Sequence, residues 1–124
     1  MANVKGFKVG LSICYDLRFP ELYQKYKNHS VDILTVPSSF TKTTGQAHWE
    51  VLLRARAIEN LAYVLAPNQF GKTANGVFTY GNSMIVNPWG KILAKASDNK
   101  EEIIYANLDK EILTEVRRRL PAII

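Results

Sequence analysis

The chain has 124 residues, of which 47% are apolar and 22% are charged, so it can form one globular domain with a buried core. Its single cysteine excludes an internal disulfide and favours a reducing compartment such as the cytoplasm, and no apolar run is long enough to cross a membrane. The formal charge is +5, but the one tight basic cluster, residues 117–119, lies in a predicted helix without a nucleic-acid motif, so we expect no nucleic-acid partner.

The first third of the chain predicts a strand–helix–strand unit. Alternating apolar residues predict a strand over 7–14 with one buried face. Pro20 suits the first turn of a helix over 20–29, and the apolar run 31–36 predicts a second strand that Pro37 closes. A unit of this size is a βαβ crossover, so the two strands are expected to be parallel.

Cys14 stands at the junction between the first predicted strand and the helix that follows. Folds of the α/β class expose nucleophiles on sharp turns at such junctions, where backbone N–H groups can face a developing oxyanion. Arg18 is close enough in sequence to stabilise a thiolate. His48, near the start of a later helix, is usually a structural residue at such a place and otherwise a candidate base. A lone cysteine at a strand end is also commonly a small buried hydrophobe, so position alone leaves both roles of Cys14 open.

Two serines follow the second predicted strand, within the segment Pro-Ser-Ser-Phe at 37–40. In open α/β sheets, ligands bind outside the carboxyl ends of the strands. Ser38 and Ser39 are therefore expected at the same sheet edge as Cys14. Their hydroxyls fit two roles, binding a substrate or capping the turn, and the sequence leaves both open.

The middle of the chain predicts a polar loop over 41–46 and a long helix over 47–62. Its polar side is formed by Arg54, Arg56 and Glu59. The predicted inward stripe comprises Ala47, Val51, either Arg54 or Ala55, Ile58 and Ala62, widened by Trp49, Leu52 and Leu53.

The remaining chain predicts a third strand over 63–67 and then a polar surface loop over 71–80. An antiparallel meander follows, with strands over 83–86, 91–96 and 101–107, the first two joined by a turn at 87–90. Asp109 is expected to cap a last helix over 110–120. The side chains of this helix that are expected to face inward are Ile112, Leu113, Val116 and Leu120. The two histidines and the one cysteine of the sequence lack metal-ligand spacing, so no metal site or cofactor is predicted.

In these motifs the chain resembles the carbon–nitrogen hydrolase (nitrilase) superfamily, and within it the Nit-type ω-amidases. The resemblance is carried by GLSICYDLRFPEL around Cys14, DILTVPSSF at 32–40, GQAHWEVLLRARAIEN at 45–60 and YGNSMIVNPWGKILA at 80–94. These segments stand in the family's order and cover nearly the whole chain. The resemblance implies an α/β fold, namely the C-terminal half of a nitrilase-like αββα sandwich, as one partial domain over residues 1–124.

The resemblance also implies a reaction, the hydrolysis of a linear ω-amide of a small carboxylic acid or of a deaminated peptide. Attack on the amide carbon would release ammonia and leave a thioester, which water then cleaves. The residues that match family positions are Cys14 as nucleophile, the backbone N–H of Tyr15 as oxyanion donor, Ser38, Ser39 and Phe40 as pocket lining, and Arg18 as a substrate contact.

In relatives, the Glu base and a Lys lie N-terminal to the nucleophile, whereas thirteen residues precede Cys14 here. We therefore expect the N-terminal half of the domain to be absent, leaving apolar surface exposed and the isolated chain inactive. The alternative is a truncated or degenerate domain without catalytic activity of its own. The predicted helices over 20–29 and 47–62 match the family's dimer interface, so a homodimer is expected for the complete enzyme.

Overall fold

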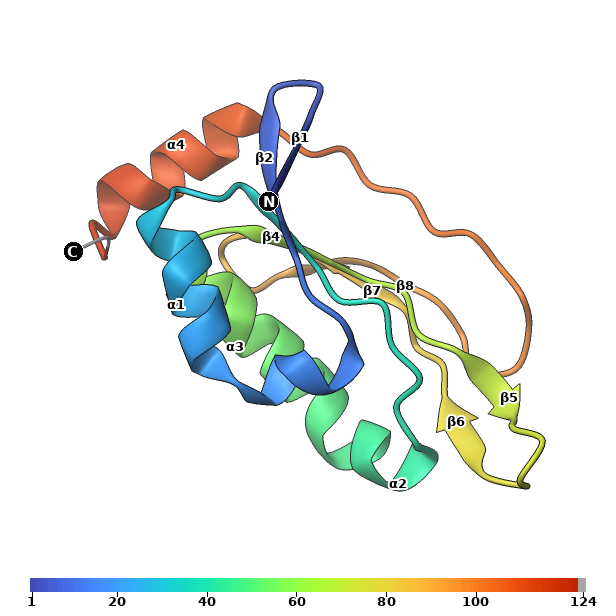
Figure 1. Ribbon diagram of the computed structural model, residues 1–124. Coiled ribbons are helices and arrows are strands. Elements are labelled where there is room, and N and C mark those ends of the chain that lie inside the picture. Colours follow the sequence, from blue (N-terminus) through green and yellow to red (C-terminus); the bar gives the residue numbers. More distant parts are fainter. Residues whose placement is uncertain (123–124) are drawn as a thin grey trace.

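The computed structural model describes residues 1–122. Its elements in chain order are β1 (Ala2–Val4), β2 (Phe7–Leu11), the 3-10 helix η1 (Cys14–Arg18), α1 (Pro20–Asn28), β3 (Ile33–Thr35), α2 (Lys42–Thr44), the π-helical turn η2 (Gly45–Trp49), α3 (Glu50–Asn60), β4 (Tyr63–Ala66), β5 (Phe70–Lys72), β6 (Phe78–Tyr80), β7 (Met84–Val86), β8 (Ile92–Lys95) and α4 (Lys110–Arg119). They form a six-stranded sheet in the order β1-β2-β3-β4-β7-β8 and a separate β5–β6 hairpin (Figure 1).

The sheet is parallel in its centre and antiparallel at its sides. Val9 of β2 pairs with Ile33 of β3, which pairs with Tyr63 of β4, and both ladders are parallel. β7 and β8 then add as an antiparallel hairpin, closed by the Gly90 N–H bond to the carbonyl oxygen of Asn87. The predicted parallel βαβ units and the hairpin that follows them are confirmed.

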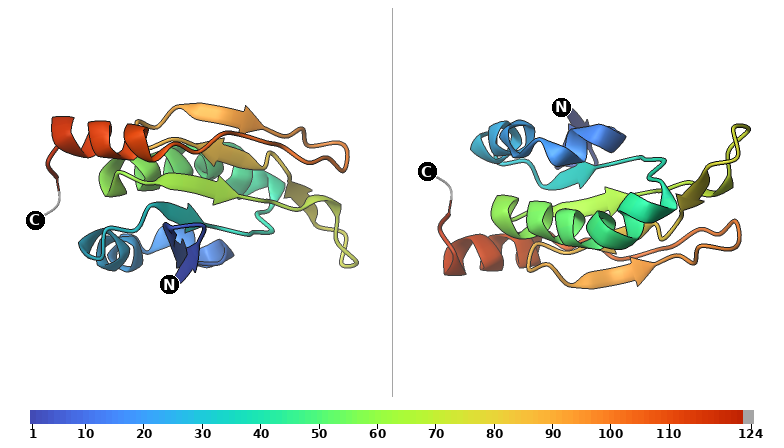
Figure 2. Two further views of the ribbon diagram at one scale, coloured as in Figure 1. Left: turned by 90° about the horizontal axis from the view of Figure 1, so that it is seen from above. Right: turned by 90° about the horizontal axis from the view of Figure 1, so that it is seen from below.

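The main core lies between the sheet and the helices α1 and α3, which pack against each other. The residues that form it include Leu34, Val64 and Val86 from the strands, Tyr23 from α1, and Trp49, Leu53 and Ala57 from the helical run. On the opposite face, Leu113 of α4 packs on Val9 and Tyr63 at one end of the sheet. Figure 2 shows the segment between β8 and α4 running back along the sheet to this helix.

The opposite face is not covered along its whole length. Leu11, two residues beyond Val9 on the same face of β2, is 53% exposed, and Ile13 is 64% exposed. The predicted burial of alternate residues over 7–14 is therefore correct only near α4. Apolar side chains are therefore exposed on this face of the sheet beyond α4.

The long helix begins earlier than predicted. Residues 42–60 form one helical run through α2, η2 and α3, so the expected loop over 41–46 is wrong. Gly45 suggested a loop, yet it has right-handed helical backbone angles and is buried. A Cβ at Gly45 would lie 2.3 Å from the Cβ of Tyr80, so the glycine serves close packing rather than a turn.

The inward face of this helix also differs from the prediction. The buried residues of α3 are Leu53, Arg56, Ala57 and Asn60. Val51 and Ile58 of the predicted stripe are exposed, and Arg56 of the predicted polar side is buried. Arg56 faces inward because the Leu17 carbonyl and Glu59 accept its hydrogen bonds. The helical period of the apolar residues does not predict this orientation.

Two further corrections concern the C-terminal part. Residues 101–107 form no strand, since they lack ladder partners in the described structure and leave Ile103 and Tyr105 more than three-quarters exposed. In α4, Leu113 and Val116 are buried as predicted, whereas Ile112 and Leu120 are exposed. Asp109 caps this helix as predicted, because its Oδ1 accepts the Glu111 N–H at 2.8 Å.

Two short hairpins were not predicted. β1 pairs with β2 through a turn at Lys5 and Gly6, both with positive φ, which suits a two-residue hairpin. β5 and β6 pair within the stretch predicted as a polar loop over 71–80. Along residues 1–122, no helix is long and apolar enough to cross a membrane.

Candidate active site

Cys14 begins the 3-10 helix η1 immediately after the sheet. Its backbone has φ of 46°, in the left-handed region, which costs a non-glycine residue about 1–2 kcal/mol. The Cys14 N–H donates to the carbonyl oxygen of Pro37 at 2.9 Å, and the Ser12 N–H donates to that of Thr35 at 3.1 Å. These bonds extend the β2–β3 pairing past the strand ends and hold the strained turn in place. Strained backbone held by its surroundings is typical of functional sites.

Three side chains also secure this turn. The Ile13 N–H donates to Oδ2 of Asp16 at 2.9 Å. The hydroxyls of Ser12 and Tyr23 lie 2.8 Å apart in the core, and Ser12 Oγ also donates to the Thr35 carbonyl at 2.8 Å. Burial is the main reason why the pKa of Tyr23 is raised above its ordinary value. The neutral hydroxyl therefore persists in its hydrogen bond with Ser12.

Arg56 of α3 holds η1 in place through hydrogen bonds. Its guanidinium donates to the Leu17 carbonyl from Nε at 3.2 Å and from Nη2 at 2.8 Å, while Nη1 pairs with Glu59 at 2.6 Å. The same guanidinium lies 5.2 Å from the ring centre of Tyr23. Arg56 thus ties α3 to the turn that carries Cys14.

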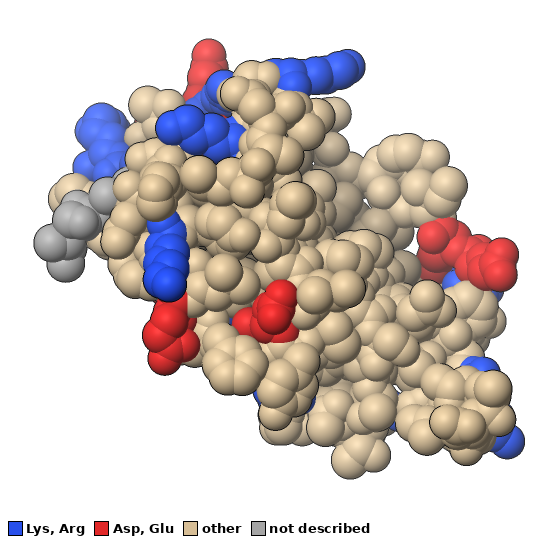
Figure 3. Space-filling view, viewed as in Figure 1, with Lys and Arg blue, Asp and Glu red and all other residues tan. Residues whose placement is uncertain are grey.

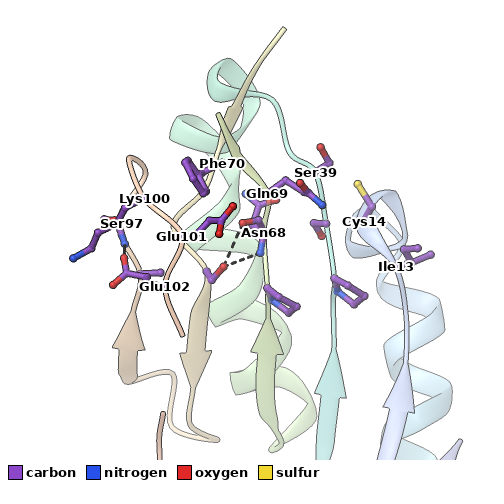
Figure 4. A pocket seen from close by; sticks show the side chains of 15 residues that line it. Ile13, Cys14, Ser39, Asn68, Gln69, Phe70, Ser97, Lys100, Glu101 and Glu102 are labelled. Carbon is purple, nitrogen blue, oxygen red and sulfur yellow. Dashed lines mark hydrogen bonds between the residues drawn. The ribbon is translucent and has the colours of Figure 1, made fainter. Parts of the chain in front are cut away.

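Cys14 opens into a cavity of about 690 Å³ at the carboxyl ends of the parallel strands (Figure 4). The lining residues are Ile13, Cys14, Pro37, Ser38, Ser39, Pro67, Asn68, Gln69, Phe70, Ser83, Ala96, Ser97, Lys100, Glu101 and Glu102. Cys14, Ser38 and Ser39 therefore lie together at one sheet edge, where the sequence placed them. The cavity is large enough for a small-molecule ligand.

Some polar side chains of this cavity already make hydrogen bonds within the protein, and others are free to contact a ligand. Ser38 Oγ donates to the Val36 carbonyl at 3.0 Å, which favours the turn-capping role for this hydroxyl. The Asn68 side chain also makes hydrogen bonds within the protein. Its Oδ1 accepts one from the Phe40 N–H at 2.9 Å, and its Nδ2 donates one to the Gly81 carbonyl at 2.7 Å. Ser39 and Gln69 are exposed in the cavity, and their side chains make no hydrogen bond within residues 1–122.

The side chains of Tyr15, Arg18 and Phe40 lie outside the cavity lining. Phe40 is buried against Trp49, with ring centres 4.8 Å apart. The Arg18 guanidinium lies over the Phe40 ring at 5.3 Å and contacts His48 Nδ1 at 3.2 Å. His48 therefore belongs to this Arg18 cluster, and no described side chain makes a hydrogen bond with the Cys14 sulfur.

The sequence analysis missed most of the cavity wall opposite Cys14. Residues 68–70 follow the carboxyl end of β4, so their position past a strand end was an available indication. Lys100 precedes the predicted strand over 101–107, which Glu101 and Glu102 begin, and no local pattern indicates that this segment folds over the cavity. Among the residues that the structure describes, no group of three His, Cys, Asp or Glu side chains could hold a metal ion.

Comparison with known proteins assigns this fold to one class. Residues 1–118 match the family described as carbon-nitrogen hydrolase, and the chain belongs to that family. It is 49% identical over 114 residues to the deaminated glutathione amidase of Dictyostelium discoideum. That match covers 92% of this chain and 39% of the amidase, so the chain spans about two fifths of its relative.

Solved structures show the same fold. The NitFhit protein of C. elegans matches with a TM-score of 0.92 and 43% identity, over 96% of this chain and 29% of that one. A mutant amidase from Nesterenkonia sp. AN1, whose active-site cysteine carries the acetamide moiety of fluoroacetamide, matches with a TM-score of 0.69 and 28% identity. This second match covers 77% of this chain and 36% of the amidase. The nitrilase-like fold class predicted from the sequence is confirmed.

Proposed function

We propose that this chain carries the nucleophile of an amidase that hydrolyses a linear amide of a small carboxylic acid or deaminated peptide. The observation that carries the proposal is Cys14 itself, a partly buried cysteine on a left-handed turn that opens into a cavity. It is the single cysteine of the sequence. The similar protein from Dictyostelium discoideum is a deaminated glutathione amidase, and the active-site cysteine of the Nesterenkonia amidase accepts a covalent adduct.

In the proposed reaction, the Cys14 thiolate attacks the amide carbon and the carbonyl electrons move onto oxygen. We assign the donor for this oxyanion to the Tyr15 N–H, as the family resemblance does, and no described group accepts a hydrogen bond from that N–H. Collapse of the intermediate breaks the C–N bond, and ammonia leaves after taking up a proton. Water then attacks the thioester carbonyl, which releases the carboxylic acid and restores the thiol. The sum is amide plus water giving acid plus ammonia.

The proton transfers need groups that the Cys14 cavity does not bring to the sulfur. The family resemblance assigns them to a Glu and a Lys on segments N-terminal to the nucleophile, and we propose the same division here. Ser39 and Gln69 are the proposed polar contacts for the substrate. Phe40 supports the segment from the core, and Arg18 is a contact only for a substrate that extends beyond the cavity.

Two acyl donors with the same acyl group test the proposal. Glutaramic acid offers an amide, whose nitrogen must be protonated to leave, whereas mono-p-nitrophenyl glutarate offers a leaving group that needs no proton. Intact-mass spectrometry measures acylation at Cys14, and ammonia and p-nitrophenolate are assayed in parallel. Cys14→Ala is the matched control for both donors.

The outcomes separate the proposed function from its alternative. Acylation and ammonia release from the amide, both lost in Cys14→Ala, establish an amidase. Acylation by the ester alone identifies a competent nucleophile in a domain that is inactive on its own. Absence of a Cys14 adduct with either donor refutes the nucleophile assignment.

We also propose that the complete enzyme is a homodimer formed through α1 and α3. Support comes from the outer side of α3, where Val51 is 66% exposed and Ile58 is 44% exposed. Residues seven apart lie on the same side of a helix, and exposed apolar residues that adjoin one another mark protein interfaces. Light scattering of the protein, compared with a Val51→Glu variant, tests the assignment, and a monomer in both samples contradicts it.

A further inference from the structure

The segment between β8 and α4 has an unpaired backbone. Within residues 1–122, no described group makes a hydrogen bond with the backbone N–H or carbonyl groups of residues 101–108. These groups need hydrogen-bond partners, and a row of free ones along an extended chain is a template for pairing with another chain. We propose that residues 101–107 pair with the same residues of a second copy of this chain, as an antiparallel β-ladder.

The side chains of this segment alternate as those of a strand do. Ile103 and Tyr105 are 76% and 80% exposed, whereas Ile104 and Ala106, which follow them, are partly buried. Successive side chains of an extended chain point to opposite sides, so one side faces the protein and the other faces solvent. In Figure 1 the segment, drawn in orange, runs as an arc along the edge of the molecule to α4. The segment therefore has the alternation of a strand and lacks a neighbouring strand among the described residues.

The segment is self-complementary in one antiparallel register. A two-fold axis at Ile104 places Ile103 of one copy opposite Tyr105 of the other, and the symmetry makes this pair twice. A β-branched residue opposite an aromatic one is a favourable cross-strand pair. The same register places Glu101 opposite Asn107. A shift of the axis by one residue in either direction would instead place a glutamate opposite a large apolar side chain.

The acidic residues of the segment do not oppose this pairing. Figure 3 shows acidic side chains gathered at the right edge of the molecule, next to uncharged side chains that continue along the path of the segment. The beginnings of two antiparallel strands lie at opposite ends of the ladder. At about 3.4 Å per residue, Glu101 of one copy would lie about 20 Å from Glu101 of the other, which is beyond about two Debye lengths at physiological salt.

The pairing would also act on the Cys14 cavity. Lys100, Glu101 and Glu102 line this cavity at the point where the segment begins. Within the described range, the Glu102 carboxylate accepts a hydrogen bond from the Ser97 backbone N–H, while the backbone from residue 101 onward is free. A ladder with a second copy would therefore fix this wall of the cavity.

Association is best measured in a Val51→Glu background, which removes an exposed apolar side chain from the contact proposed for α3. Analytical ultracentrifugation over about 1–200 μM should show a monomer–dimer equilibrium, because a small interface gives weak association. Ile103→Lys should weaken this association about tenfold, since the two-fold axis applies the substitution twice and a charged edge opposes pairing. Val77→Lys is the matched control, because it places the same charge at another exposed apolar position, and it should leave the association unchanged.

Cysteine cross-linking tests the register. With Cys14→Ala added to the same background, Ile103→Cys and Tyr105→Cys variants are oxidised separately and as a mixture. Copper phenanthroline in air joins two thiols as a disulfide and passes their electrons to oxygen. Residues directly opposite one another come closer to disulfide geometry than diagonal ones do. The mixed disulfide, identified by its mass, should therefore form several times faster than the disulfide of either variant alone.

Three outcomes would overturn the inference. They are a monomer at the highest concentration in the Val51→Glu background, equal weakening by the two lysine variants, and equal cross-linking in the separate and mixed samples. The measurements require no hydrolysis and no α3 contact. A failed amidase assay therefore leaves the pairing standing, and a failed pairing leaves the assignment of Cys14 standing.

Discussion

The guanidinium of Arg56 donates two hydrogen bonds to the carbonyl oxygen of Leu17, from a position 39 residues further along the chain. Leu17 belongs to the turn that Cys14 begins, and Arg56 is only 6% exposed. A buried cation that is hydrogen-bonded on several sides fixes the relative position of the two segments it joins. The strained turn at Cys14 therefore depends on α3 as well as on the sheet.

Replacement of Arg56 by Met should lower the free energy of unfolding by about 2–3 kcal/mol. The Leu17 carbonyl would remain buried without its charged donor, and such bonds are among the stronger ones. Arg118→Met is the control, because Arg118 is exposed and its pair with Glu115 spans 3.6 Å. Urea unfolding measures both variants. Equal losses in the two variants would contradict the role of Arg56.

The left-handed backbone at Cys14 predicts an unusual response to glycine. Cys14→Gly should unfold with a free energy about 1 kcal/mol higher than Cys14→Ala, because glycine adopts positive φ without a Cβ clash. At Ala55 in α3, the change to Gly should instead destabilise by about 1 kcal/mol. Thermal unfolding compares the three variants. If Cys14→Gly is the less stable of the Cys14 pair, the turn is not strained.

Gly45→Ala should destabilise the protein by about 1–3 kcal/mol, although alanine is the better helix former. The added methyl group would lie 2.3 Å from Tyr80. Tyr80→Gly removes both the Cβ and the ring atoms that obstruct this space, so Gly45→Ala should cost much less in that background. A double-mutant cycle measures the coupling. Additive effects of the two substitutions would show that Tyr80 is not the obstacle.

Stability should fall as the pH rises above about 10, the ordinary range of a tyrosine hydroxyl. Burial raises the pKa of Tyr23 and of Tyr63 in the folded protein. The unfolded chain therefore releases these protons first, and alkaline pH favours unfolding, whereas the stabilisation is fully present below that range. Chemical denaturation at several pH values should show a shallower slope in the Tyr23→Phe and Tyr63→Phe double variant. An identical slope would assign the alkaline loss to other groups.

The local patterns of the sequence were sufficient for much of the fold. Alternation, Pro20 and Asp109 predicted the parallel units, the start of α1 and the cap of α4, because each depends on neighbours within one turn or one strand. The motif around Cys14 likewise predicted both the family and the turn at the sheet edge.

Only the tertiary structure decided which polar and glycine residues are enclosed and which loop faces the thiol. Arg56 is buried because Leu17 and Glu59 satisfy its donors, and position 45 takes no side chain because Tyr80 packs on Gly45. Glu101 enters the cavity because the segment after β8 leaves the sheet instead of pairing with it. Each outcome depends mainly on contacts between residues that are distant in sequence, and such contacts leave no period or spacing in the chain itself.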